Sequence, residues 1–247
     1  PEVIQQIDSE IPDIIFCDTE RKPEGERYLK YLQPEIKELL KKYSSITKRI
    51  AIEVPPFTQD IDTQLKKEKP EKEFLSLNNK LNRLTLYFNE LKKSEVAVVS
   101  LPEKERINNG KTKKPKETKS ALGFSYLYEI NPAIVLAELV NELAVHIDSK
   151  LQLINTSSKP YLISNELITS SFLHTYKILA VTDYSQQSIS ENLKKHNTGK
   201  VILRFQVKPE EYWKIRNFYE KDLDKSGKEV QLFINEKTKE AIICERI

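Results

Sequence analysis

The sequence predicts an α/β protein in two parts, and three observations lead to this prediction. A strand, a helix and a second strand follow one another within residues 12–54, which is typical of a parallel βαβ unit. Three more strands follow in quick succession within residues 74–100. A charged segment at 103–120 then precedes a second α/β region. We therefore expect domains at 1–102 and 121–247, joined by a mobile basic loop or linker at 103–120.

The first βαβ unit is expected from its apolar pattern. Residues 12–18 are an apolar run that ends in Asp18, as in a buried parallel strand. Pro34 opens a helix in which apolar side chains recur at helical spacing, namely Ile36, Leu39, Leu40 and Tyr43. A second strand covers residues 50–54 and stops at Pro55-Pro56.

The next three strands are expected at residues 74–77, 83–88 and 95–100. The gap between the last two is too short for a crossover helix, so these two are expected to pair as an antiparallel hairpin. The first domain is thus predicted to be a parallel sheet that ends in an antiparallel hairpin.

The second domain alternates strands and helices. Asn131-Pro132 is expected to cap one long helix that runs to Ile147. Later helices are predicted at 185–195 and from Pro209, and strands at 123–129, 151–154, 161–163, 174–181, 200–207, 230–234 and 241–245, the last two as a hairpin.

Composition excludes several classes of protein. The 247 residues carry a net charge of +3 and 31% charged residues, and no apolar run reaches the ~18 residues that span a bilayer. Cys17 and Cys244 have no Cys or His nearby in the sequence, and the three histidines are far apart. We expect a soluble protein of the reducing cytoplasm, with no metal site.

Two residue types are scarce. The sequence has no Met, even at position 1, so we expect a fragment, a processed product or a sequence from which modified methionines were left out. It has five glycines, and no two of them lie within ten residues of each other. P-loops, GxGxxG turns and nucleophile elbows all need clustered Gly, so none is visible.

The first candidate site is the end of the first strand. Ligands of open α/β sheets bind at the carboxyl ends of strands, where Asp18 is followed by Arg21 and Lys22. The alternative is that Asp18 only caps a turn. Glu53 ends the second strand and could reach the same crevice, but a salt bridge to Lys48 or Arg49 is the interpretation that we favour.

Two motifs carry a resemblance to a known family. Tyr126-Leu127-Tyr128-Glu129 with Pro132-Ala133 is similar to the opening of the second domain in class I S-adenosylmethionine-dependent methyltransferases with a THUMP-like C-terminal domain. Asp18 and Arg21 match the strand-end motif of that family, roughly Asp-Pro-Ala-Arg-Arg, with Lys22 as a conservative change. Thr19 and Glu20 depart from it.

The resemblance implies a fold. Residues 1–102 would be the C-terminal half of a Rossmann-like methyltransferase sheet, and a smaller THUMP-like α/β domain would follow. The Gly-rich cofactor loop belongs to the other half of such a sheet. The implied cofactor is S-adenosylmethionine, and this chain alone is expected to bind it weakly or not at all.

The resemblance also implies roles for residues. Asp18 would be the catalytic residue that accepts a hydrogen bond from the target amine, although Thr19 does not pre-set the turn as Pro would. Arg21 and Lys22 would hold a phosphate of the substrate. The implied substrate is RNA. The rival hypothesis is a non-catalytic RNA- or protein-binding module that kept the fold.

Two further regions are candidates for RNA contact. The segment from Glu103 to Ser120 has seven basic and three acidic residues, and its candidate phosphate ligands are Lys111, Lys113, Lys114 and Lys116. A solvated surface loop is the alternative. Arg204 is followed by Tyr212, Trp213 and Arg216, a pattern that can stack bases, but the helical spacing of the aromatic residues favours a place in the core.

Overall fold

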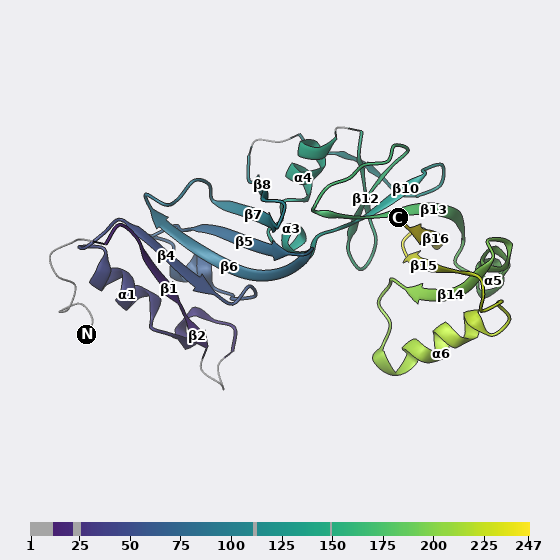
Figure 1. Cartoon of the computed structure of the whole chain (residues 1–247), viewed down its shortest axis with the longest axis horizontal. Coiled ribbons are helices and arrows are strands. Elements are labelled where there is room, and N and C mark those ends of the chain that lie inside the picture. Colours follow the sequence, from purple (N-terminus) through teal and green to yellow (C-terminus); the bar gives the residue numbers. More distant parts are fainter. Residues whose placement is uncertain (1–11, 22–25, 111–112, 149) are drawn as a thin grey trace. The chain divides into compact units, whose positions relative to one another are not determined.

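The computed structural model describes residues 12–21, 26–110, 113–148 and 150–247, which form two compact units (Figure 1). The first unit comprises residues 1–111 and 132–139, and the second comprises residues 112–131 and 140–247. The chain thus leaves the first unit within the segment predicted as a linker, and residues 132–139 return to it.

The first unit is built mainly from strands. Its helical elements are η2 (Leu29–Tyr31), α1 (Ile36–Tyr43), α2 (Ile61–Gln64) and α3 (Pro132–Leu136). Its strands are β1 (Ile15–Asp18), β2 (Glu20–Arg21), β3 (Leu32–Gln33), β4 (Arg49–Val54), β5 (Glu71–Leu77), β6 (Lys80–Asn89), β7 (Val96–Leu101) and β8 (Glu105–Asn108). The predicted order of β1, α1 and β4 is confirmed, and β1 pairs with β4 in parallel.

The six-stranded sheet has the order β1-β4-β6-β5-β7-β8. β6 and β8 run opposite to the other four strands, and β6 is antiparallel to both β4 and β5. The expected hairpin between residues 83–88 and 95–100 is wrong, because β7 pairs in parallel with β5 and β6 forms its hairpin with β5. Asn78 and Asn79 make the two-residue turn of that hairpin with φ of 49° and 60°, a conformation that Asn tolerates well.

The segment predicted as a mobile basic loop contains regular structure. β8 adds to the edge of the first sheet beside β7, and Asn109 accepts hydrogen bonds from the backbone of Glu95 and Val96, both at 3.0 Å. β9 (Lys116–Thr118) joins the sheet of the second unit beside β11. The prediction failed because pairing with β7 and with β11 compensates for the polar, charged composition of this segment.

The second unit has a larger sheet. Its helices are α4 (Val140–Ile147), α5 (Gln186–Lys195) and α6 (Pro209–Glu220). Its strands are β9, β10 (Tyr126–Ile130), β11 (Gln152–Asn155), β12 (Pro160–Ser164), β13 (Leu173–Asp183), β14 (Thr198–Leu203), β15 (Lys228–Asn235) and β16 (Glu240–Arg246). They follow the order β14-β15-β16-β13-β10-β12-β11-β9.

The predicted long helix after Asn131 is two helices. Glu138 adopts a left-handed φ of 59° between α3 and α4, which ends the first helix. α3 belongs to the first unit, where it packs on β5 and β6, and α4 belongs to the second. Apolar periodicity continues through the break, so the pattern alone predicted one helix.

The two faces of the second sheet have separate cores. On one face Ile189 and Leu193 of α5 and Tyr219 of α6 cluster with apolar residues of β14, β15 and β16. The other face holds an aromatic group in which Tyr161 and Tyr176 both contact the edge of Phe233, at centroid distances of 5.5 and 5.1 Å.

The second sheet curls around this aromatic face. The Tyr161 hydroxyl on β12 donates to the backbone oxygen of Arg204, just after β14, at 3.4 Å. Four strands lie between β12 and β14, so a flat sheet would separate them by roughly 24 Å. The aromatic face is therefore concave, and the curvature is visible in Figure 1.

Across the part of the chain that the structure describes, no helix is both long and apolar enough to cross a bilayer.

Candidate functional site

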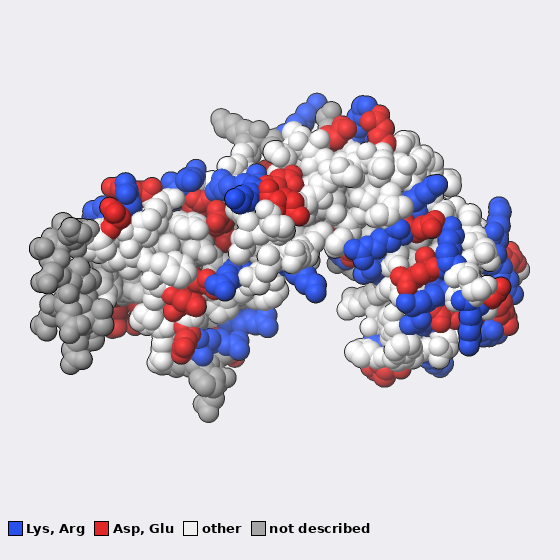
Figure 2. Space-filling model, viewed as in Figure 1, with Lys and Arg blue, Asp and Glu red and all other residues white. Residues whose placement is uncertain are grey.

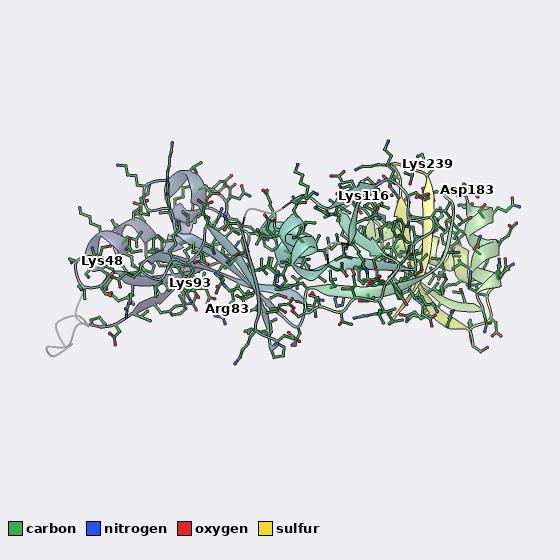
Figure 3. All side chains as sticks on the ribbon, turned by 90° about the horizontal axis from the view of Figure 1, so that it is seen from above. Lys48, Arg83, Lys93, Lys116, Asp183 and Lys239 are labelled. Carbon is green, nitrogen blue, oxygen red and sulfur yellow. The ribbon has the colours of Figure 1, made fainter. Side chains whose placement is uncertain are left out.

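The carboxyl ends of β1 and β4 bring three charged residues together. Asp18 is in register with Glu53, and the Arg83 Nη1 atom of β6 lies 2.6 Å from the Glu53 Oε2 atom (Arg83 is labelled in Figure 3). The hydrogen bond and charge of Glu53 raise the pKa of Arg83, and the charge of Asp18 adds a smaller contribution. The favoured bridge from Glu53 to Lys48 or Arg49 is wrong, since Arg49 pairs with Glu90 and Lys48 donates to the Ser44 carbonyl.

Thr19 fixes the turn that follows Asp18. Its hydroxyl donates to the Glu53 carbonyl oxygen at 2.8 Å, and its backbone N–H donates to the same oxygen at 3.3 Å. Thr19 is buried, whereas Asp18 is exposed. These two hydrogen bonds, which we call the Thr19 clamp, order the turn at the position where the family motif has proline.

A pocket of about 580 Å³ is formed after the carboxyl end of β4. Residues 56–63, which follow β4, form one wall, and Phe74 and Leu84 of β5 and β6 form an apolar floor. The Arg27 guanidinium stacks over the Phe57 ring at 5.0 Å, and both line the pocket. Flat aromatic and guanidinium surfaces suit a planar ring.

Hydrogen bonds hold the pocket wall to the segment after β1. The Gln59 N–H donates to the Arg27 carbonyl at 2.7 Å, and the Leu29 N–H donates to Asp60 Oδ1 at 3.0 Å. Lys72 pairs with Asp62 at 2.8 Å on the rim. The pocket is therefore built from the loops that follow two parallel strands, as ligand sites of open α/β sheets are.

The structure separates the predicted strand-end residues. Asp18 lies at the carboxyl edge but does not line the pocket. Arg21 is exposed in β2, opposite Leu32 of β3, and Lys22 lies outside the described residues. Sequence reasoning placed Asp18 correctly at the end of a strand but missed the pocket, although Pro55-Pro56-Phe57 directly after a strand was an available signal.

The predicted RNA-contact lysines line a pocket of the second unit. Lys113, Lys114 and Lys116 surround a hollow of about 420 Å³ whose floor includes Ala144, Val145 and Leu151. Lys116 begins β9 (labelled in Figure 3), and Lys111 lies outside the described residues.

The aromatic residues of α6 only partly follow the prediction. Tyr219 is buried, but Trp213 is 62% exposed, so its expected place in the core is wrong. The Arg216 guanidinium lies 5.2 Å from the Trp213 ring and pairs with Glu220, while Arg204 lies over Tyr176 on the concave face of the sheet.

Comparison with known proteins gives one informative likeness. No family model and no curated protein sequence match the chain. A crystal structure described as a putative methyltransferase from Porphyromonas gingivalis W83 superposes with a TM-score of 0.68 at 15% identity, over 99% of this chain. The chain has a methyltransferase-like fold. It spans 62% of the length of that solved chain, and at this identity the likeness concerns the fold alone.

Proposed function

We propose that this chain carries the methyl-acceptor side of an S-adenosylmethionine-dependent methyl transfer to RNA. The observation that carries the proposal is the pocket of about 580 Å³ that the loop after β4 forms, at the sheet edge where β1 also ends in the exposed Asp18. The methyltransferase-like fold supports the reaction class, and the proposed substrate rests on the family resemblance of the sequence.

Phe57 and Arg27 would bind the target base in this site. The exposed Phe57 ring offers a stacking surface, and aromatic side chains contribute about 1–3 kcal/mol per stacked base. Arg27 would cover the base or contact its phosphate, with Arg21 and Lys22 as further phosphate ligands.

Asp18 would orient the methyl acceptor. Among the described residues its carboxylate has no hydrogen bond or ion pair, so it is available to accept from an exocyclic amine. The Thr19 clamp holds the backbone that carries Asp18, which limits the positions the carboxylate can take.

The residues of this chain are better suited to bind the methyl acceptor than to bind the cofactor. S-adenosylmethionine supplies the methyl group when bound, but the five dispersed glycines form no Gly-rich turn for its methionine and ribose portions. This chain alone is therefore expected to bind the cofactor weakly or not at all. That scarcity also favours the second candidate function, a non-catalytic RNA-binding module of the same fold.

A transfer assay tests the reaction. With the Gly-rich half of such a sheet supplied, we expect labelled methyl groups from saturating S-adenosylmethionine to enter RNA, and Asp18→Asn to lower the rate about 10-fold or more, because the amide disturbs the acceptor that orients the amine. Asp13→Asn, which changes an exposed carboxylate before β1, is the matched control and should retain the rate. Absence of transfer by the unaltered chain would leave the binding module as the function.

A salt titration tests the RNA partner separately. Each lost phosphate contact lowers the slope of log affinity against log salt by about 0.7–0.9. Replacing Lys113, Lys114 and Lys116 with Gln should flatten this slope, whereas replacing Lys66, Lys67 and Lys225, also exposed, should not. Equal slopes for both triple variants would remove these lysines from the RNA site, and no binding at low salt would remove RNA as the partner.

A further inference from the structure

The concave face of the second sheet ends in a group of charged residues, which we call the concave cluster: Glu129, Lys159, His174, Arg204 and Arg246. Cross-strand register places Glu129 of β10 directly opposite Tyr161 of β12 and His174 of β13. The neighbouring row pairs Tyr176 of β13 with Arg246 of β16. Directly opposed residues of antiparallel strands share a face, so the cluster faces one side of the sheet.

Contacts hold the cluster together. The Glu129 carboxylate pairs with the Lys159 ammonium and accepts the Tyr176 hydroxyl at 2.9 Å. The Arg204 guanidinium lies 5.9 Å from the centre of the Tyr176 ring, and its Nε donates to Gln231 at 2.7 Å. Curling of the sheet is what brings Arg204, from beyond β14, over β13.

The position of Arg246 defines which nitrogen of the His174 ring carries the proton. The Arg246 Nη2 atom lies 3.4 Å from the His174 Nδ1 atom. Arginine can only donate, so His174 Nδ1 must accept, and the imidazole is neutral with its proton on Nε2. The donor at Nε2 remains available to a further ligand.

The cluster has more positive charge than its carboxylate needs. Glu129 is already satisfied by Lys159 and Tyr176, and Glu229, another carboxylate near Arg204, pairs with Lys200, so neither requires Arg204 or Arg246 to neutralise it. Burial lowers the pKa of His174, and the charges of Arg246, Arg204 and Lys159 lower it further against the opposite effect of Glu129. The surroundings of His174 are therefore electropositive. Figure 2 shows Lys and Arg side chains gathered among acidic ones over the strands β14–β16.

We propose that the concave cluster is a binding site for a phosphate group, held by Arg204, Arg246 and Lys159, with His174 donating from Nε2. Arginine guanidinium groups match phosphate oxygens geometrically, and the mouth of a curled sheet is a usual place for a ligand. The phosphate is that of an RNA backbone or of a free nucleotide. The site lies wholly within the second unit, so the proposal does not depend on methyl transfer in the first.

Proton NMR of the histidine rings in the full chain tests the proposal directly. A phosphate dianion beside His174 favours the charged imidazolium, so inorganic phosphate at up to about 20 mM should raise its pKa by about half a unit or more. His146 and His196 lie outside the cluster and serve as internal controls. An unchanged His174 titration would overturn the proposal.

Variants separate the site from a general effect of charge. Arg246→Gln and Arg204→Gln should each weaken phosphate binding about 10-fold or more, because each removes a charge-assisted hydrogen bond. Lys237→Gln removes one positive charge in the turn after β15, at the opposite end of that strand from Arg246, and should leave binding unchanged. Arg246 is exposed near the C-terminus, so its variant should keep the fold even where Arg204→Gln, which loses its Gln231 contact, does not. Equal binding by Arg246→Gln and the unaltered chain would overturn the proposal.

The source of the phosphate is decided by two ligands in the same NMR experiment. A single-stranded RNA without terminal phosphate presents only diesters, and a nucleoside monophosphate presents only a monoester. A response of His174 to the first assigns the site to an RNA backbone, and a response to the second assigns it to a nucleotide. No response to either ligand or to inorganic phosphate would exclude a phosphate site at this face.

Discussion

Each sheet buries a glutamate on an interior strand, and the two glutamates have different surroundings. Glu71 on β5 is 1% exposed and accepts from the backbone N–H groups of Lys93 and Ser94, the Ser94 hydroxyl and the Arg106 guanidinium. Glu129 on β10 has a 13% exposed side chain and, among the residues that the structure describes, two side-chain partners, Lys159 and Tyr176.

The difference separates a structural ion pair from a binding cluster. The contacts of Glu71 attach the loop before β7 and, through Arg106, the edge strand β8. Arg106 also pairs with Glu73 at 3.4 Å, so its positive charge is balanced by two carboxylates. Around Glu129, by contrast, Arg204 and Arg246 are not needed to neutralise the carboxylate, and they lie at a partly exposed surface. Burial of a carboxylate is therefore less informative about function than the balance of charge around it.

The largest expected effect is at Glu71. Glu71→Ala removes the acceptor of four hydrogen bonds and leaves Arg106 without its main partner, so the free energy of unfolding should fall by about 3 kcal/mol or more. Urea denaturation followed by circular dichroism measures this.

Glu73→Ala is the control for Glu71. Glu73 contacts the same Arg106 from a more exposed position, so its loss should cost about 1 kcal/mol or less. If the two variants lose the same free energy of unfolding, the buried position of Glu71 does not make it more important for stability than Glu73.

A smaller effect is expected at Glu129. Its partner Lys159 is 38% exposed, and solvent screens the pair, so Glu129→Gln should lower the free energy of unfolding by about 1 kcal/mol. Burial raises the pKa of Glu129, but the hydrogen bond and charge of Lys159 with the Tyr176 hydroxyl lower it below 4.5 overall.

The sign of this pKa shift predicts a pH dependence. The contribution of Glu129 is complete above the unfolded value of 4.5 and is lost as the pH falls through the lower folded value. Unfolding curves of the unaltered chain and Glu129→Gln should therefore converge as the pH falls below 4.5. If the difference in the free energy of unfolding between the two proteins stays constant as the pH falls, the assignment of Lys159 as the partner is contradicted.

The smallest effect is expected at His174. Its folded pKa lies below the unfolded value of 6.5, so the unfolded chain takes up a proton first and stability falls as the pH drops through 6.5. His174→Gln should lose less stability between pH 7 and pH 5 than the unaltered chain. Arg246→Gln should also reduce this loss, because Arg246 is the main charge that lowers the His174 pKa. A steeper acid loss in either variant would contradict the electropositive character of the cluster.

Local patterns of the sequence predicted most individual elements correctly. The apolar run before Asp18, the spacing of Ile36, Leu39 and Leu40, and the run ending at Pro55 all correspond to β1, α1 and β4. The helix predicted at 185–195 is α5, with Ser185 as its N-cap, which accepts from the Ser188 N–H at 3.2 Å. These features depend on neighbouring residues only, so periodicity and capping preferences were sufficient.

Pairing of the strands could not be predicted in the same way. β7 lies on the far side of β5 from β6, where Glu71 binds the backbone at Lys93 and Ser94, a contact between residues more than twenty positions apart. Similarly, the polar segment 105–108 becomes β8 only because β7 offers it a free edge. Composition carries no information on such partners.

The sequence by itself determined the α/β class, the parallel β1–β4 pair and the position of Asp18 at a strand end, because each follows from residues adjacent in the chain. Only the tertiary structure decided which charged groups meet. Arg83 and Glu53, 30 residues apart, form one pair at the edge of the first sheet, and Arg204 and Tyr176 are brought together by the curl of the second. Sheet curvature and strand order result from packing across the whole unit, so the residues of the pocket and of the concave cluster become neighbours only after folding.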